Sequence, residues 1–278
     1  MQETPLKITM VIFSATGNTR TIASQMAAQL RERGAAVETC DITAHTADQP
    51  PIDCSACDAV IFGFPVHSLR APRVVRDWLR TLDGQRKKCA TFFTYGGFIV
   101  HPAHQSTRTI LEERGFSLVA SAEFPGAHTF NLGGWRAFPQ RPDQRESELA
   151  KRYVDAVYDR LSGKDNAMPG ELPAGNFSEA ELDQFEAFRF KVVSQLPARM
   201  GTECSLCGLC EENCPTGAMD AATGAADPAA CIACLRCVAD CPEHALTIND
   251  TSPSWRNKLA MSQITEEELD DQIGTLYL

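Results

Sequence analysis

The sequence predicts an α/β protein in which a parallel sheet, covered by helices on both faces, is followed by a small cysteine-rich module. Strand-like and helix-like segments alternate along residues 7–161, which is the pattern of a parallel sheet with crossover helices. Two cysteine runs of the same spacing follow at residues 204–215 and 231–242. A Gly/Pro-rich stretch at residues 163–175 separates these two regions and reads as a linker.

Each expected strand is a short apolar run rich in branched or aromatic residues, and each helix repeats apolar residues at helical spacing. In residues 21–34, Ile22, Met26 and Leu30 recur at that spacing and Gly34 ends the helix. The expected strands span residues 7–13, 35–42, 57–66, 87–97 and 116–126. The expected helices span residues 21–34, 73–82, 103–115, 145–161 and 178–196. Five parallel strands of this kind favour the strand order 2-1-3-4-5.

Composition narrows the class of protein. The net charge of −10 argues against nucleic-acid binding, and no apolar run approaches the ~18 residues of a membrane span. The N-terminal residues lack the features of a signal peptide, so we expect a cytoplasmic location. Residues 1–165 carry 20 Lys/Arg against 18 Asp/Glu, whereas residues 201–250 carry one Arg against 8 Asp/Glu. The acidic module could dock a basic partner or simply be an acidic surface, and charge alone leaves both interpretations open.

Each cysteine run reads C-x-x-C-x-x-C-x-x-x-C-P, a spacing typical of 4Fe-4S cluster binding. Three closely spaced thiols hold one cluster, and the fourth cysteine of each run ligates the other cluster. One 4Fe-4S cluster is therefore expected on Cys204, Cys207, Cys210 and Cys241, and a second on Cys231, Cys234, Cys237 and Cys214. Zinc usually takes two separated C-x-x-C pairs, and disulfides need an oxidising compartment, so both alternatives are disfavoured.

The loop "SATGNTR", residues 14–20, follows the first expected strand and precedes a helix. Its hydroxyl side chains, the turn at Gly17 and the helix N-terminus together suit a phosphate group. The loop is neither the P-loop of nucleoside triphosphatases nor the G-x-G-x-x-G of nicotinamide-dinucleotide enzymes. The remaining alternative is an ordinary strand–helix turn with Ser/Thr capping.

The two regions resemble two known families. The loop "SATGNTR" resembles the phosphate loop of flavodoxins, and the likeness extends over residues 5–163. Residues 201–250 resemble bacterial two-cluster ferredoxins, including the "CPTGAM" and "CPEHALTI" segments. The whole chain therefore resembles flavodoxin–ferredoxin fusion proteins. The resemblance implies a flavodoxin-like doubly wound five-stranded sheet, a small α+β ferredoxin domain, FMN and two 4Fe-4S clusters as cofactors.

The resemblance also implies which loops hold the flavin. The phosphate would lie in the first loop, and the flavin ring between the loops that follow the third and fourth strands, at residues 64–72 and 94–100. The expected cofactor-binding residues are Ser14, Ala15, Thr16, Gly17, Asn18, Thr19, Pro65, Val66, His67, Ser68, Thr94, Tyr95, Gly96, Gly97 and Phe98. Many free flavodoxins flank the ring with Trp and Tyr in acidic loops. Here the third-strand loop instead carries His67 and Arg70, which could give the flavin a basic face.

Weaker patterns lie outside these motifs. Cys54 and Cys57 form a C-x-x-C pair without a following helix N-terminus, so ordinary cysteines are favoured over a redox pair. His101 and His104 have ligand-like spacing, but a role at a helix start is favoured because no nearby thiol or carboxylate completes a metal site. The loop at residues 126–136 is either a cover over the flavin or a plain connection.

The expected domains are a flavodoxin-like FMN-binding domain (1–163), a linker and connecting helix (164–200), a ferredoxin domain (201–250) and a tail (251–278). We expect an iron–sulfur flavoprotein that transfers electrons between its clusters and FMN, as a carrier or a one-to-two-electron converter. Its partners would be redox proteins such as a ferredoxin or a reductase. The alternative is an FMN-dependent reductase of a small molecule held by His67, Arg70 and the 126–136 loop. No acid, base or nucleophile constellation identifies a catalytic residue.

Overall fold

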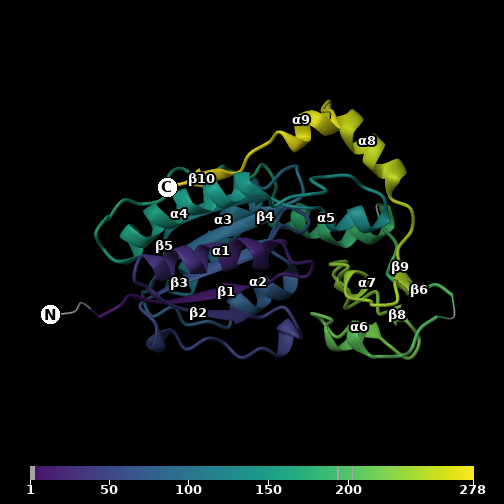
Figure 1. Cartoon of the computed structure of the whole chain (residues 1–278), viewed down its shortest axis with the longest axis horizontal. Helices are drawn as coiled ribbons and strands as arrows, with labels where there is room; N and C mark the ends of the chain where they lie inside the picture. The colour runs from purple at the N-terminus through teal and green to yellow at the C-terminus, as the bar shows by residue number, and fades with distance from the viewer. Residues whose placement is uncertain (1–3, 193, 202) are drawn as a thin grey trace.

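The computed structural model describes residues 4–192, 194–201 and 203–278. Its main feature is a six-stranded sheet in the order β10-β5-β4-β3-β1-β2 (Figure 1). The five strands β1 to β5 are parallel, and their order 2-1-3-4-5 confirms the predicted topology. β10 is antiparallel to β5 and was not predicted.

The flavodoxin-like region contains β1 (Lys7–Ile12), α1 (Asn18–Glu32), β2 (Ala36–Asp41), β3 (Ala59–Pro65), α2 (Arg73–Leu79), β4 (Lys88–Tyr95), α3 (His101–Glu113), β5 (Ser117–Pro125) and α4 (Gln144–Leu161). Short 3-10 turns occur at η1 (Thr46–Asp48), η2 (Cys54–Ala56) and η3 (Thr129–Gly133). The remainder contains α5 (Glu179–Val192), β6 (Ala198–Arg199), α6 (Leu209–Glu212), β7 (Met219–Asp220), β8 (Ala225–Ala226), α7 (Arg236–Ala239), β9 (Leu246–Thr247), α8 (Ser252–Ser262), α9 (Glu266–Asp270) and β10 (Thr275–Tyr277).

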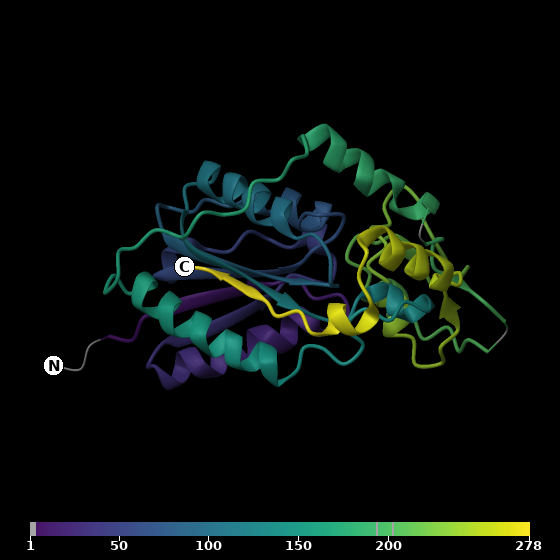
Figure 2. The ribbon, with the colours of Figure 1, turned by 90° about the horizontal axis from the view of Figure 1, so that it is seen from above.

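Helices cover both faces of the sheet. α1 and α4 lie side by side on one face, and α2 and α3 lie on the other (Figure 2). The predicted apolar stripe of α1, which includes Ile22, Met26 and Leu30, is fully buried against the sheet. The central strands β3, β4 and β5 are buried along almost their whole length, as expected for a parallel sheet between two helical layers.

The cysteine-rich module forms a second, four-stranded sheet of very short antiparallel strands in the order β7-β8-β6-β9. It lies at the end of the molecule toward which the parallel strands run (Figures 1 and 2). The backbone N–H groups of His45 and Thr46 donate to the carbonyl groups of Cys214 and Pro215, at 3.3 and 2.8 Å. His45 and Thr46 follow β2, so the module is bonded to the carboxyl edge of the large sheet.

The segment after the module returns to the large sheet. Residues 251–278 form α8, α9 and β10, which runs beside β5 (Figure 2). The backbone N–H of Thr251 donates to the carbonyl of Gly133 at 2.6 Å, where this return begins. The cysteine-rich module is therefore held between two segments of the chain that both contact the flavodoxin-like region.

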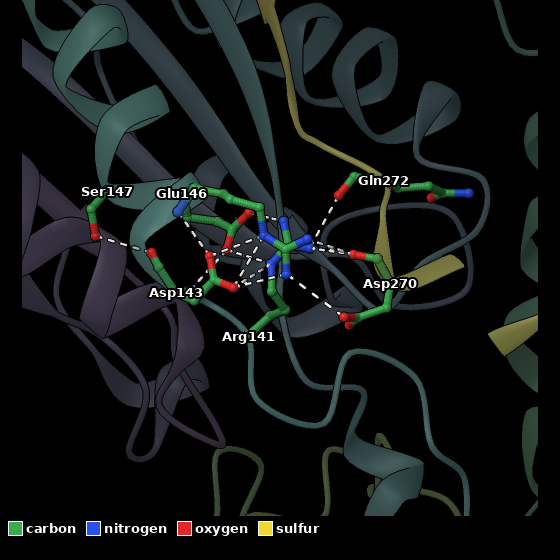
Figure 3. Close-up of polar contacts among 7 residues, drawn as sticks. Arg141, Asp143, Glu146, Ser147, Asp270 and Gln272 are labelled. Atoms are coloured by element: carbon green, nitrogen blue, oxygen red, sulfur yellow. Dashed lines mark hydrogen bonds and ion pairs between the residues drawn. The ribbon is translucent and has the colours of Figure 1, made fainter. Parts of the chain in front are cut away.

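A buried arginine anchors the returning segment (Figure 3). The Arg141 guanidinium pairs with the Glu146 carboxylate, and each side chain is 1% exposed. The same guanidinium donates to the carbonyl groups of Asp270 and Gln272, at 2.9 and 3.1 Å. Glu146 also accepts from the backbone N–H of Asp143 and so completes the capping box of α4.

Replacing Glu146 by alanine leaves the Arg141 charge buried and without its main counter-charge. We expect the Glu146→Ala variant to lose about 3–5 kcal/mol of unfolding free energy. Urea denaturation of the protein measures this loss. The matched control is Glu112→Ala, which breaks the exposed Arg108–Glu112 pair of α3 and should cost no more than about 1 kcal/mol. Equal losses in the two variants would contradict the anchoring role.

Candidate functional site

The first loop has the conformation expected of a phosphate site. Gly17 adopts a positive φ of 98° at the N-cap position of α1, where it has no side chain to cap the helix. The Ser14 hydroxyl accepts from the backbone N–H of Arg20 at 3.0 Å, which folds the loop around the helix start. The loop thus directs a helix N-terminus and several hydroxyl groups into one pocket, where a phosphate is electrostatically favoured.

Three further loops meet the first one at the carboxyl edge of the sheet. The hydroxyl groups of Thr19 and Thr94 are 2.8 Å apart and join the first loop to the loop after β4. The Asn18 side-chain amide donates to the carbonyl of Ala127 at 2.8 Å and joins it to the loop after β5. The backbone N–H of Val66 donates to the carbonyl of Thr94 at 2.9 Å. These bonds fix four loops around one pocket.

The pocket is lined mostly by the expected residues. Its walls consist of Ser14, Ala15, Thr16, Asn18, Thr19, Pro65, Val66, His67, Thr94, Tyr95, Gly96, Gly126, Ala127, His128 and Thr129. Residues 126–129 were expected only as one of two alternatives for their loop. Their place after the carboxyl end of the fifth strand was the available signal, because ligands bind at that end of such sheets.

His128 is packed closely into this wall. Its Nδ1 accepts from the backbone N–H of Phe130 at 3.0 Å, and its ring lies 4.6 Å from the Trp135 ring. A Cβ atom at Gly96 would overlap the His128 side chain. Glycine at this position therefore allows the loop after β4 to approach the loop after β5, which narrows the pocket.

Four of the expected flavin residues do not line the pocket: Gly17, Ser68, Gly97 and Phe98. Gly17 and Ser68 shape their loops through positive φ values of 98° and 46°. Gly97 lies under Leu269 of α9, and Phe98 packs against Trp135 and Trp255. Of these partners, Leu269 and Trp255 belong to the returning C-terminal segment, whose position is not visible in the local sequence.

Arg70 does not give the flavin pocket a basic face, which corrects that expectation. Its guanidinium is 1% exposed and donates to Glu179, Asp183 and Glu186 of α5, at 2.7, 2.7 and 3.0 Å. The hydrogen bond from Arg70 holds the pKa of Asp183 below its ordinary value. Charge neutralisation by α5 therefore removes Arg70 from the groups that could bind an anionic substrate.

The eight cluster-motif thiols gather into two sets that match the expected ones. Cys204, Cys207, Cys210 and Cys241 line one pocket, although Cys241 belongs to the second run. The other set surrounds Cys237. Burial raises the pKa of the Cys237 thiol, and the neighbouring thiols of Cys234, Cys231 and Cys214 raise it further.

The two motifs share an unusual backbone conformation. Leu206 and Gly208 in the first run have positive φ values of 58° and 81°, and Ala233 and Leu235 have 51° and 58° at the same places in the second. Alternating right- and left-handed residues turn successive N–H groups inward, which forms the anion-binding concavity typical of iron–sulfur sites. Three of these residues are not glycine, so the conformation carries a strain that a bound anionic group would offset.

The donor geometry also bears on the zinc and disulfide alternatives. Among the described residues, the structure contains no disulfide bond, which disagrees with the disulfide alternative. In the same part of the chain, no three His, Cys, Asp or Glu side chains converge closely enough for a single metal ion.

The thiol sets differ in exposure. Cys207 is exposed at the surface, next to the exposed side chains of Leu206 and Leu209. Cys214 and Cys234 are buried, and the carbonyl of Cys214 is bonded to the flavodoxin-like region. We call the set with Cys207 the outer set and the set with Cys214 the inner set.

The weaker sequence patterns have structural roles. Cys54, Cys57 and Cys89 are buried in the core, and burial raises the pKa of Cys54 to about 11. His104 lies in the first turn of α3, and its side chain is buried. Its two ring nitrogens contact Ser121 and Glu123, at 2.7 and 3.0 Å.

Comparisons with known proteins agree with this geometry. The family model for a flavodoxin domain matches residues 9–125, and the model for a 4Fe-4S dicluster domain matches residues 197–250. The chain therefore joins an N-terminal flavodoxin domain to a C-terminal ferredoxin-type domain, which confirms the family recognised from the sequence. It is a protein of flavin and iron–sulfur electron transfer. No protein of curated function matched the sequence.

Solved structures with a similar fold include flavodoxins and larger flavoproteins. A flavodoxin from the domain Archaea is 14% identical, with 56% of this chain and 99% of that chain covered and a TM-score of 0.43. Flavodoxin 1 from Bacillus cereus is 22% identical, with the same coverage and a TM-score of 0.42. Rubredoxin oxygen:oxidoreductase from Desulfovibrio gigas is 19% identical, with 59% of this chain and 38% of that chain covered and a TM-score of 0.41.

The thiol sets lead to a prediction about the cysteine that crosses between motifs. Cys241→Ser and Cys207→Ser should remove the same cluster, so each variant should contain about half the iron of the wild-type protein. Cys214→Ser should instead give the spectrum of Cys234→Ser. Iron analysis measures the iron content of each variant, and electron paramagnetic resonance of the reduced proteins gives their spectra. Cys40→Ser is the control and should resemble the wild-type protein. Shared spectra within each sequence run, rather than within each set, would contradict the pairing.

Proposed function

We propose that this protein transfers electrons between two 4Fe-4S clusters and FMN, and so acts as a carrier or one-to-two-electron converter. The outer thiols Cys204, Cys207, Cys210 and Cys241 would hold one cluster, and Cys231, Cys234, Cys237 and Cys214 the other. The FMN phosphate would lie in the loop of Ser14–Thr19. When bound, the clusters would supply one-electron transfer and the flavin would supply two-electron storage.

The observation that carries this proposal is the bonded connection between the inner thiol set and the phosphate loop. The carbonyl groups of Cys214 and Pro215 accept from His45 and Thr46, and the Thr46 hydroxyl donates to the carbonyl of Thr43 at 3.2 Å. The Thr43 hydroxyl accepts from the backbone N–H of Ser14 at 2.8 Å. Only a few residues therefore separate a proposed cluster ligand from the proposed flavin site.

The chain's own residues would control access to the two cofactors. The inner set has two buried thiols and no exposed one, whereas Cys207 of the outer set is exposed, so solvent and partners would reach the outer set first. His128 and Thr129 form part of the wall of the flavin pocket. Leu269 packs against Gly97, which follows the lining residue Gly96. This arrangement supports exchange of electrons with a partner at the outer set and storage at the flavin.

The surface around the outer set supports a basic redox protein as the partner. The exposed apolar side chains of Leu206 and Leu209 lie in the first cysteine run. Four exposed acidic residues lie within or close to the two cysteine runs: Glu203, Glu211, Glu212 and Glu243. An apolar centre with a charged rim is typical of transient protein interfaces. The acidic rim would attract a basic partner and raise its association rate.

The alternative is a flavin-dependent reductase of a small molecule. The loop at residues 126–129 lines the pocket, which is the observation that favours this alternative. Arg70, however, is bonded to α5, so one of the three groups expected to hold the substrate is absent from the pocket. The carrier is therefore the function that the site supports best.

In the described part of the chain, no helix is long and apolar enough to cross a membrane. We propose a cytoplasmic location, because cysteines that ligate iron–sulfur clusters suit a reducing compartment.

The function is tested by rapid anaerobic reduction of the reconstituted protein by a reduced ferredoxin. We expect loss of the oxidised-flavin absorbance in wild type to be at least tenfold faster than in Cys207→Ser, which lacks the outer cluster but retains FMN. Cys40→Ser should react like wild type. Equal rates in wild type and Cys207→Ser would overturn the proposed route, and a protein that binds no FMN would overturn the function itself.

The acidic rim predicts a dependence on salt. Reduced protein should transfer electrons to cytochrome c, a basic acceptor, at a rate that falls steeply as ionic strength rises. Reversing two rim charges, Glu211→Lys with Glu212→Lys, should lower the low-salt rate at least tenfold and abolish most of the salt dependence. The control reverses Glu112 and Glu113 on α3, far along the chain from the thiols. A salt-independent rate in wild type would contradict the docking surface.

A further inference from the structure

The loop after β3 contains a strained turn whose ends are bonded to each other. The backbone N–H of His67 donates to the carbonyl of Arg70 at 2.7 Å, and the N–H of Arg70 donates back to His67 at 3.1 Å. Ser68 and Leu69, between them, both have positive φ values, of 46° and 70°. Such a turn favours Asn and Gly, so Ser and Leu adopt it only where the surroundings hold it.

The Arg70 side chain supplies that restraint. It extends to one stripe of α5, where Glu179, Asp183 and Glu186 recur at helical spacing and accept from its two terminal nitrogens. Glu186 also accepts from Arg76 at 2.9 Å. Without α5, the Arg70 charge would be buried without a counter-charge, and the side chain would have to move toward solvent together with the turn.

The turn begins at a residue that lines the flavin pocket. Val66 and His67 line the pocket, and His67 is 5% exposed. A change in the His67–Arg70 turn therefore displaces His67 relative to any ligand in the pocket. α5 itself joins the flavodoxin domain to the first strand of the cysteine-rich module, so its contact with Arg70 connects the position of the module to the shape of the pocket.

We propose that Arg70 is a positioning residue for the flavin, held by the carboxylates of α5 so that the His67–Arg70 turn keeps the pocket in its binding conformation. This inference rests on the proposed function, because it assumes that the ligand of the pocket is FMN. Docking of α5 would then be a condition for tight binding of FMN.

The test removes two of the three α5 charges that pair with Arg70 and leaves Arg70 and Glu186 in place. Glu179→Gln combined with Asp183→Asn changes two side chains that are each 68% exposed, so the fold should persist. The control is Glu112→Gln with Glu113→Gln on α3, which removes the same charge from a helix of the flavodoxin-like domain that, among the described residues, makes no polar contact with Arg70.

Two measurements distinguish positioning from a general charge effect. In the protein without FMN, hydrogen exchange of residues 64–72 should become about tenfold faster in the α5 variant, with the other strands unchanged. FMN affinity should fall about tenfold, which corresponds to ~1.4 kcal/mol. A general charge effect would instead raise the FMN affinity, because removing acidic groups should tighten binding of the negatively charged phosphate.

Unchanged hydrogen exchange in residues 64–72, or an FMN affinity equal to or tighter than that of the control, would overturn the proposal.

A conservative replacement of Arg70 adds a further check. Arg70→Lys keeps the charge but cannot reach the carboxylates with a fork of two nitrogens, so its exchange should resemble that of the α5 variant. Protein that binds no FMN in any form would refute the proposed function, while the exchange measurement would still decide the role of Arg70.

Discussion

The antiparallel pairing of β10 with β5 is the constraint on which the arrangement of the two domains depends. Because β10 belongs to the large sheet, the chain has to return from the cysteine-rich module to the flavodoxin domain. Gly274 allows this approach, since a Cβ atom there would overlap the carbonyl of Glu123. The module is consequently attached at both of its ends, through α5 before it and through α8 and α9 after it.

This double attachment explains why Cys214 of the inner set lies beside the loop after β2. The chain before the module is bonded through α5 to Arg70, and the chain after it through Thr251 to Gly133. Both contacts fall on loops at the carboxyl edge of the sheet, where the flavin pocket lies. A single flexible linker would leave the distance between the cofactors variable, whereas these contacts hold Cys214 near the phosphate loop.

Buried arginines maintain the arrangement, and each is neutralised by acidic groups. Arg141 joins α4 to the returning segment, and Arg70 joins the flavin loop to α5. Burial of a charge is costly unless a partner is present, so each arginine makes the position of one segment depend on that of another. The same dependence makes the flavin loop sensitive to a helix that lies outside the flavodoxin domain.

Most of the fold could be predicted because its signals are local. The five parallel strands, their order and the four covering helices follow from apolar spacing within each segment. Most residues expected to bind the cofactor line one pocket, the exceptions being Gly17, Ser68, Gly97 and Phe98. Their role in binding FMN stays a prediction. The loop of Gly126–Thr129 was only an alternative, because its contacts with Asn18 and Gly96 join residues far apart in the sequence.

The sequence by itself indicated a flavin and iron–sulfur protein. The cysteine spacing of each run and the strand–loop–helix around residues 14–20 are local patterns, and backbone geometry acts over such short distances. Tertiary structure alone decided that Arg70 faces α5, that β10 extends the sheet and that Leu269 covers Gly97. These contacts join residues more than a hundred positions apart, and they depend on complementary charge and shape that no local pattern records.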